Sequence, residues 1–248
     1  MTDPFAIAAI FTALALGGLL KGAIGLGSPI LAVPVMATVF DVRTAVVLMV
    51  LPNLITNIWQ FWAYRGQLPG KRVFWLFGLA GGIGALLGTV ALSQLSGPAL
   101  SLGVAGSVIA FVLLRIARPN WRLGTRITAQ LAIPVGVLAG LLQGASGVSA
   151  PVMVSFLNAI RLERLVFIAV VSLAFLCMAL VQVPLQETLG LMTWDLAILS
   201  LFALIPLLAF MPIGAWLARR ISAATFDRIV LVILSLLAAK LIWDAVTG

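Results

Sequence analysis

Two glycine-rich breaks interrupt long apolar stretches of the chain and bring polar groups into them. The first, KGAIGLGSP, runs from Lys21 to Pro29, and the second, QGASGVSAP, runs from Gln143 to Pro151. Serine followed at once or closely by proline is typical of a helix start, which presents free N–H groups and the positive end of the helix dipole. Glycines permit positive φ and close approach of a ligand. Two such helix starts, with a lysine beside one, suit a small anion near the middle of a membrane.

The residues expected to bind the anion are those of the breaks, together with two asparagines on one face of the apolar run that follows the first break. They are Lys21, Gly22, Gly25, Gly27, Ser28, Pro29, Asn53, Asn57, Gln143, Gly144, Ser146, Gly147, Ser149 and Pro151. The asparagines could instead be hydrogen-bond partners between helices, and a single glycine break could be a packing kink. Lys21 could extend towards lipid headgroups. Two breaks at matching positions favour a binding site.

The composition predicts an integral membrane protein. Hydrophobic residues make up 63% of the 248 residues and charged residues 9%, with a mean hydropathy of +1.23. The start, MTDPF, does not resemble a removable signal peptide. The chain has no histidine and one cysteine, Cys177. We therefore expect no metal site, no cofactor and no disulfide, and an enzyme is disfavoured because few groups remain for acid–base chemistry.

Long uncharged runs predict the membrane-spanning helices. Five occur at 45–64, 73–95, 98–114, 165–183 and 196–218, and a sixth at 223–243 has charges near its ends. Gly84 and Gly88 form a GxxxG pair that predicts close helix packing. Twelve of the fifteen basic residues fall in connections at 65–72, 115–126, 161–164 and 219–228, which should be cytoplasmic. The basic residues behind the net charge of +8 then orient the chain in the bilayer, with both termini outside, and do not indicate nucleic-acid binding.

The two breaks belong to a repeat with an offset of 122 residues, which matches Gly22 with Gly144 and Gly25 with Gly147. It predicts an all-α polytopic protein with a first half at 1–117, a basic cytoplasmic linker at 118–126 and a second half at 127–248. Each half would comprise a glycine-broken hairpin and three transmembrane helices. In the first half the loop after the first long span is basic and the following loop is not, whereas the second half has the reverse order. The two halves should therefore be inverted in the membrane, as in secondary transporters. The arms at 5–20 and 30–40 leave open whether the first hairpin is re-entrant.

The segments GAIGLGSPILAVP and GASGVSAPVMVSF, each followed by a charged corner and a long span, resemble the TauE/SafE (TSUP) family of sulfite exporters. The resemblance covers nearly the whole chain. It implies a transporter of the bacterial inner membrane for sulfur-containing anions such as sulfite, sulfoacetate or thiosulfate, coupled to the proton gradient. The sequence departs from the most glycine-rich form of the family at Ala23, Ser146 and Ser149, which leaves the substrate open.

Proton coupling has two carboxylate candidates, Asp41 and Glu163, at matching corners after the hairpins. Each has arginines nearby and could instead form an ion pair, and a substrate that carries its own proton would need no relay. We expect an alternating-access exporter whose partners are a small anion and the lipid bilayer. The alternatives are an importer of an organic carboxylate or sulfonate and a membrane subunit without transport activity. The sequence leaves self-association open.

Overall fold

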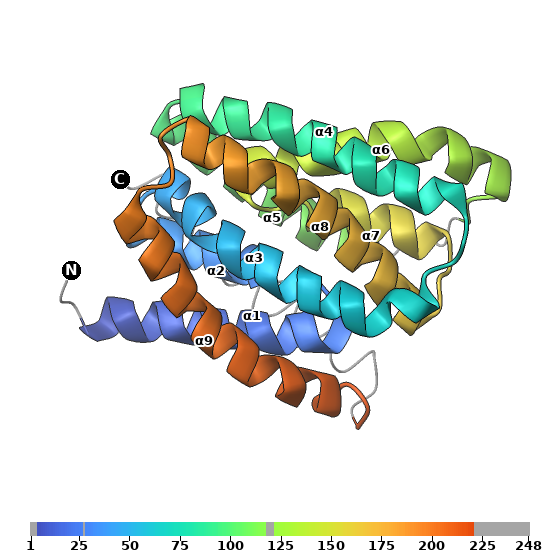
Figure 1. Ribbon diagram of the computed structural model, residues 1–248, viewed down its shortest axis with the longest axis horizontal. Helices are drawn as coiled ribbons and strands as arrows, with labels where there is room; N and C mark the ends of the chain where they lie inside the picture. The colour runs from blue at the N-terminus through green and yellow to red at the C-terminus, as the bar shows by residue number, and fades with distance from the viewer. Residues whose placement is uncertain (1–3, 27, 118–121, 221–248) are drawn as a thin grey trace.

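A computed structural model describes residues 4–26, 28–117 and 122–220, and within them every regular element is a helix (Figure 1). Six helices are long and apolar enough to cross a membrane, which confirms the predicted all-α, polytopic membrane class. The elements are α1 Pro4–Ile24, α2 Ser28–Ala37, α3 Val42–Tyr64, the 3₁₀ turn η1 Arg65–Gln67, α4 Arg72–Gln94, α5 Gly97–Ala117, α6 Thr125–Ser146, α7 Ala150–Ala159, α8 Arg164–Thr188 and α9 Trp194–Leu217.

Five predicted spans correspond to α3, α4, α5, α8 and α9. The sixth, at 223–243, lies outside the described residues, as do Gly27 and residues 118–121 of the predicted linker. The hairpins have unequal arms. The first arms, α1 and α6, have 21 and 22 residues and are about 32 Å long, whereas α2 and α7 have ten residues and are about 15 Å long. Each hairpin therefore combines one arm of full membrane-crossing length with one that reaches about halfway.

The helix bounds of the second hairpin repeat those of the first at the predicted offset. Helices α1 and α6 end 122 residues apart, α2 and α7 begin and end 122 residues apart, and so do the starts of α3 and α8. Gly25 and Gly147 have φ of 78° and 71°, so the prediction that these glycines supply positive φ is confirmed. In Figure 1, α1 begins at the left-hand end of the bundle and α6 at the right-hand end. The two hairpins thus enter from opposite ends.

The long helices pack across the two halves of the chain. Helix α1 lies along α9, α6 along α4, and α3 against α8. Glycines make the first two contacts close, because a Cβ at any of them would collide with a backbone carbonyl of the partner helix. The pairs are Gly18 with Leu207, Gly22 with Met211 and Gly214 with Leu19 in α1–α9, and Gly140 with Gly81, Gly144 with Ala85 and Gly88 with Leu141 in α4–α6. The close packing predicted for Gly84 and Gly88 is confirmed.

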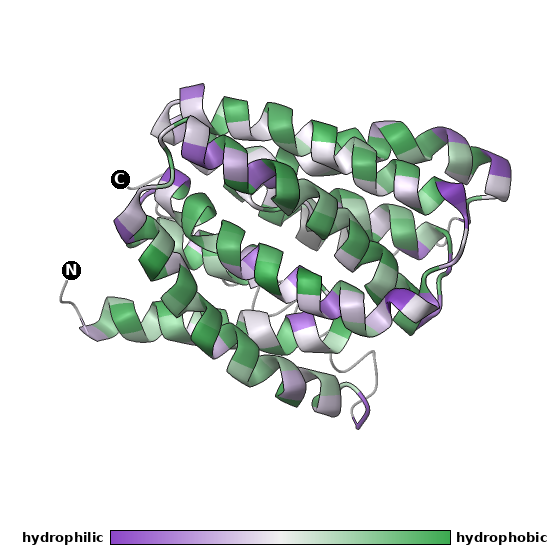
Figure 2. Cartoon of the chain, in the orientation of Figure 1, coloured by the Kyte–Doolittle hydropathy of each residue, from purple (hydrophilic) through white to green (hydrophobic). Residues whose placement is uncertain are grey.

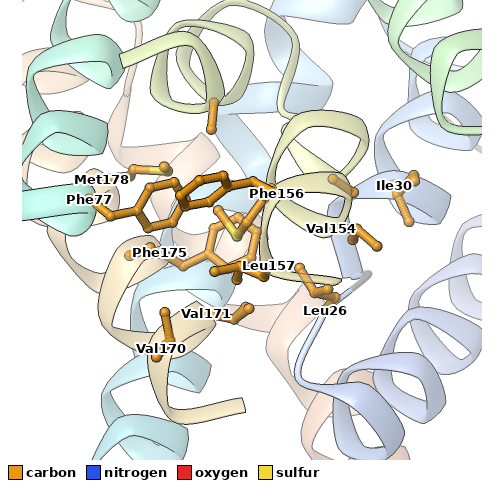
Figure 3. Packing of buried hydrophobic residues seen from close by; sticks show 14 of the residues in the cluster. Leu26, Ile30, Phe77, Val154, Phe156, Leu157, Val170, Val171, Phe175 and Met178 are labelled. Carbon is orange, nitrogen blue, oxygen red and sulfur yellow. The ribbon is translucent and has the colours of Figure 1, made fainter. Parts of the chain in front are cut away.

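The apolar core lies between the two hairpins and draws on both halves (Figure 3). Phe77 of α4 stacks on Phe156 of α7, with ring centroids 5.3 Å apart. Leu26, within the first break, belongs to the same cluster as Val154 of α7. The turns of the hairpins are therefore buried in protein, which is the condition under which non-helical backbone is tolerated at membrane depth.

Polar residues gather at the two ends of the bundle, whereas its length is mostly apolar (Figure 2). The α3–α4 connection and the starts of α6 and α8 lie together at the right-hand end in Figure 1. These segments carry basic residues that the sequence assigned to one side of the membrane: Arg65, Lys71, Arg72, Arg122, Arg126, Arg161 and Arg164. We call this end of the bundle the basic end.

Asp41 caps the N-terminus of α3 at the opposite end, and its loss should lower stability. Its carboxylate accepts hydrogen bonds from the Thr44 backbone N–H (3.0 Å) and hydroxyl (2.6 Å). Partial burial raises the pKa of Asp41, but these bonds and the Arg43 charge lower it by more, so the pKa lies below its usual value. We expect Asp41→Ala to cost about 1 kcal/mol, or an unfolding temperature lower by about 2–4 °C, in a detergent thermal melt at pH 7.

The same group gives a pH dependence of defined sign. Because the pKa of Asp41 is lower in the folded protein, its contribution is present above the unfolded pKa of about 4 and is lost as pH falls through the folded pKa. Asp41→Asn keeps a capping oxygen and should melt near the parent temperature at pH 7. Equal melting of the parent protein and Asp41→Ala would contradict the capping role.

Candidate functional site

Lys21 lies in the last turn of α1 and is buried inside the bundle, with 1% of its surface exposed. Its Nζ donates a hydrogen bond to Asn57 Oδ1 (2.9 Å) and lies 5.5 Å from the ring centroid of Phe175. Among the described residues it forms no ion pair with a carboxylate. An ammonium has three donors, so two of the Lys21 N–H groups remain available. The arrangement leaves a buried positive charge without a counter-charge.

Asn57 connects Lys21 to a second asparagine. The Asn57 side-chain amide donates to the backbone oxygen (2.6 Å) and to Oδ1 (2.8 Å) of Asn53. Asn53 Nδ2 and Ser28 Oγ have no hydrogen-bond partner among the described residues, although each residue is only 1% exposed. Buried polar atoms usually have partners, so these two are unusual in a packed interior. Together with Lys21, which uses one of its three N–H groups, they give the first half three buried polar groups whose donors the described residues leave wholly or partly unused.

Side chains from α3 and α8 hold the end of α1 in place. Gln60 of α3 donates to the Lys21 carbonyl (2.9 Å), and Ser172 of α8 donates to Gln60 Oε1 (3.3 Å). Arg164, at the start of α8, donates to the Ala23 carbonyl through Nε (3.1 Å) and an Nη atom (2.6 Å). The Lys21 carbonyl also accepts from the Gly25 backbone N–H (2.8 Å). The last carbonyls of a helix commonly lack a partner within it, so the Arg164 bonds satisfy part of what the break leaves open.

The second break has no charged side chain. Ser149 donates to Gln143 Oε1 (2.9 Å), and Ser146 donates to the Leu142 carbonyl (2.8 Å). The predicted helix starts are confirmed, with Pro29 and Pro151 each one residue inside α2 and α7. Ser149 is the N-cap residue of α7, although its hydroxyl bonds to Gln143 and not to a backbone N–H of that helix. Ser28 is the first residue of α2 and does not precede it as a cap.

The turns of the two breaks lie at different depths. Gly25 packs against Ile168 near the start of α8, whereas Gly147 packs against Val33 and against Val46 near the start of α3. Asn57 of α3 bonds to Lys21 and so marks the depth of the lysine. Val46, which marks the depth of Gly147, lies 11 residues or about 16 Å away along α3. The predicted residues thus fall into two groups: Lys21, Asn53 and Asn57 are joined by hydrogen bonds, and Gln143 and Ser149 form a separate pair.

Comparison with known protein families decides which class of protein carries this site. The model of the sulfite exporter TauE/SafE family matches residues 10–241, nearly the whole chain. The chain belongs to the TauE/SafE family. Searches of curated proteins and of solved structures gave no match. The resemblance predicted from the two break motifs is confirmed, and the TauE/SafE protein belongs to a family of membrane anion transporters and not of enzymes.

The two carboxylates predicted for proton coupling lie at opposite ends of the TauE/SafE protein. Asp41 immediately precedes α3, and Glu163 immediately precedes α8 at the basic end. Neither forms an ion pair with Lys21. Asp41 is occupied as a helix cap, and Glu163 makes no capping hydrogen bond. The geometry connects neither carboxylate to the buried lysine.

Sequence reasoning did not anticipate the part of the TauE/SafE site that comes from α8. Phe175 and Ser172 reach the Lys21 region, yet an apolar ring and a lone serine carry no motif. One signal was available. The buried residues 168, 172, 175, 179, 182 and 186 of α8 follow a helical stripe, and they lie 122 residues after 46, 50, 53, 57, 60 and 64. Applying the repeat offset to Asn53 and Asn57 would have indicated the face of α8 that meets them.

Proposed function

We propose that this TauE/SafE protein exports a small sulfur oxyanion, such as sulfite or sulfoacetate, by alternating access, with Lys21 as the charge that binds it. The observation that carries the proposal is a lysine 1% exposed within a membrane-spanning helix, without an ion-pair partner among the described residues. A charge buried in this way is costly unless an opposite charge joins it. A bound anion would supply that charge.

The number of available donors favours an anion with several oxygen atoms. Asn53 Nδ2, Ser28 Oγ and the two free N–H groups of Lys21 are buried without partners in the described chain. A sulfite or sulfonate group presents three oxygens, so it could accept from more than one of these donors at once. A halide can also accept several hydrogen bonds, but it lacks the directional oxygens that such separate donors select. The second group, Gln143 and Ser149, would line the path farther from the charge, together with Ser146 of the same break.

The repeated helix bounds and the matching glycine contacts support two inverted repeats, 1–117 and 127–248, joined by a basic linker. Lys21 is closed to solvent, so an anion can reach it only after the helices around the breaks rearrange. We place the protein in the bacterial inner membrane with the basic end in the cytoplasm and the termini outside. If each hairpin can adopt the conformation that the other now has, the site would open first to one side of the membrane and then to the other.

Coupling to protons is best explained by the substrate itself. Asp41 has a pKa below its usual value and is held by Thr44, so it stays ionised at neutral pH and is a poor proton carrier. Glu163 lies outside the Lys21 hydrogen-bond network. Hydrogen sulfite carries its own proton and could cross with it, leaving the carboxylates with structural roles.

Flux into proteoliposomes tests the proposal. Purified protein would be exposed to rapid jumps of sulfite, thiosulfate, sulfoacetate, taurine, lactate and chloride, with and without a pH gradient. We expect saturable uptake of sulfur oxyanions, measured by radiolabel and by current, and none in protein-free liposomes. Uptake restricted to lactate would favour the carboxylate importer. Absence of flux for every anion, together with no ligand-induced rise in unfolding temperature, would favour a non-transporting subunit.

A further inference from the structure

Two glutamines towards the end of the bundle opposite the basic end are buried, and some of their hydrogen-bonding atoms have no partner among the described residues. Gln186 is 0% exposed and neither atom of its side-chain amide has a partner, and Gln182 is 2% exposed with Oε1 unpartnered. They are four residues apart on α8, which places them on one helix face. Three such atoms in one stretch of a packed membrane protein indicate a role other than packing.

These glutamines continue the helix face that meets Lys21. The buried stripe of α8 includes Ser172, which donates to Gln60, and Phe175, whose ring lies beside Lys21. Farther along the same stripe come Gln182 and Gln186, the latter 11 residues or about 16 Å beyond Phe175. The stripe therefore runs from the Lys21 region to the end of the bundle opposite the basic end.

Helix α3 supplies most of the polar groups towards the basic end, where the α8 stripe has Ser172 alone. The matching stripe of α3 is polar at Asn53, Asn57 and Gln60, towards the basic end, and apolar at Val46 and Val50. The repeat offset relates Gln60 to Gln182, and the two helices carry their amide side chains towards opposite ends of the bundle. Ser172 of the α8 stripe bonds to Gln60 of α3, and the two helices pack together, so we treat the two stripes as one contact and call it the α3–α8 seam.

We propose that the transported oxyanion moves along this α3–α8 seam and that Gln182 and Gln186 form a second, uncharged binding station on it. Because a primary amide both donates and accepts hydrogen bonds, the station suits a hydrogen oxyanion, which has an O–H group as well as acceptor oxygens. The Lys21 site binds the anion through a positive charge. The glutamine station has no charge, so it releases the anion more readily. The inference rests on the proposed function for the identity of the ligand, but the route itself does not.

Cysteine reactivity tests the route independently of the substrate. Cys177 is the single cysteine of the chain, so Cys177→Ala gives a background without thiols. Into it we would introduce Gln182→Cys, Gln186→Cys or, as a control on the lipid-facing side, Leu180→Cys, where leucine is 56% exposed. A small anionic methanethiosulfonate would be loaded on both sides of proteoliposomes. We expect cysteines at 182 and 186 to react and the cysteine at 180 to stay unmodified.

Transport and stability supply the second readout. Gln182→Leu and Gln186→Leu remove unpartnered polar atoms, so the unfolding temperature should be unchanged or higher and sulfite should still raise it through Lys21. Sulfite flux should nevertheless fall by about tenfold or more, the effect of a barrier raised by one lost hydrogen-bonding station. A structural role would instead lower stability together with flux.

The outcomes separate this inference from the proposed function. Inert cysteines at 182 and 186, or leucine variants that transport at the parent rate, would overturn the seam while leaving the Lys21 proposal in place. Reactive cysteines in a protein that moves no sulfur oxyanion would support the seam and refute the proposed substrate.

Discussion

Replacing Lys21 with methionine should abolish anion transport and leave the protein folded. Methionine is an unbranched side chain of similar length, so the packing around α1 is largely kept. It removes the buried ammonium that donates to Asn57. Removing one partner of a buried charge pair costs about 3–5 kcal/mol, so affinity for the anion should fall by about 100-fold or more. Sulfite-induced thermal stabilisation and radiolabelled sulfite uptake would be measured for the same preparation.

The matched control is Lys71→Met, which removes a surface lysine between α3 and α4. It should transport at the parent rate, because an exposed charge is solvated and makes little difference to a buried site. The free energy of unfolding should change little for Lys21→Met without ligand, since losing the Asn57 hydrogen bond is offset by no longer burying an ammonium. Undiminished sulfite uptake by Lys21→Met would refute the assignment of the binding charge.

Gly140→Ala should destabilise the protein strongly, although it adds a single methyl group. A Cβ at this position in α6 would collide with the backbone carbonyl of Gly81 in α4, which cannot move aside as a flexible side chain would. The helices must separate, and overpacking of this kind costs about 3 kcal/mol or more. For a chain of this size the unfolding temperature should fall by at least about 6 °C.

The same substitution has the opposite expected sign in α5. A Cβ at Gly103 would meet no atom within 4 Å, and alanine is a better helix former than glycine. Gly103→Ala should therefore leave the unfolding temperature unchanged or raise it. Unfolding can be followed with a dye that becomes fluorescent on reacting with Cys177, which is partly buried in the folded protein. Equal melting temperatures for Gly140→Ala and Gly103→Ala would show that the α4–α6 contact is not close.

The architecture was largely predictable because the membrane restricts the possible structures. Runs without charge can only be helices at that depth, and the five predicted spans inside the described residues agree with α3, α4, α5, α8 and α9. The positive φ at Gly25 and Gly147 followed from the lack of a side chain. The inverted relation of the halves stays a prediction, supported by the repeated helix bounds. The predicted arms at 5–20 and 30–40 already differed in length, but α1 runs on to Ile24, because Lys21 and Gly22 lie inside the helix and do not end it.

The site was less predictable, because depth and rotation about a helix axis depend on packing between distant segments. The face shared by Asn53 and Asn57 could be read from their spacing, but their link to Lys21 depends on how α1 lies against α3. The contact between Phe175 and Lys21 joins residues 154 positions apart and has no local signal. Similarly, the two turns lie at different depths because each hairpin packs against a long helix from the other half of the sequence, α1 against α9 and α6 against α4.

The exchange of partner helices has a consequence for biogenesis. Helix α1 leaves the ribosome well before the helix that its glycines fit, which is α9 and begins at Trp194. At about 5–20 residues per second, α9 follows α1 by roughly 10–40 s. During this interval the glycine face of α1 has no native partner, and the neighbouring Lys21 has yet to be enclosed. An insertion factor that shields α1 until α9 has emerged would shorten its exposure to premature degradation.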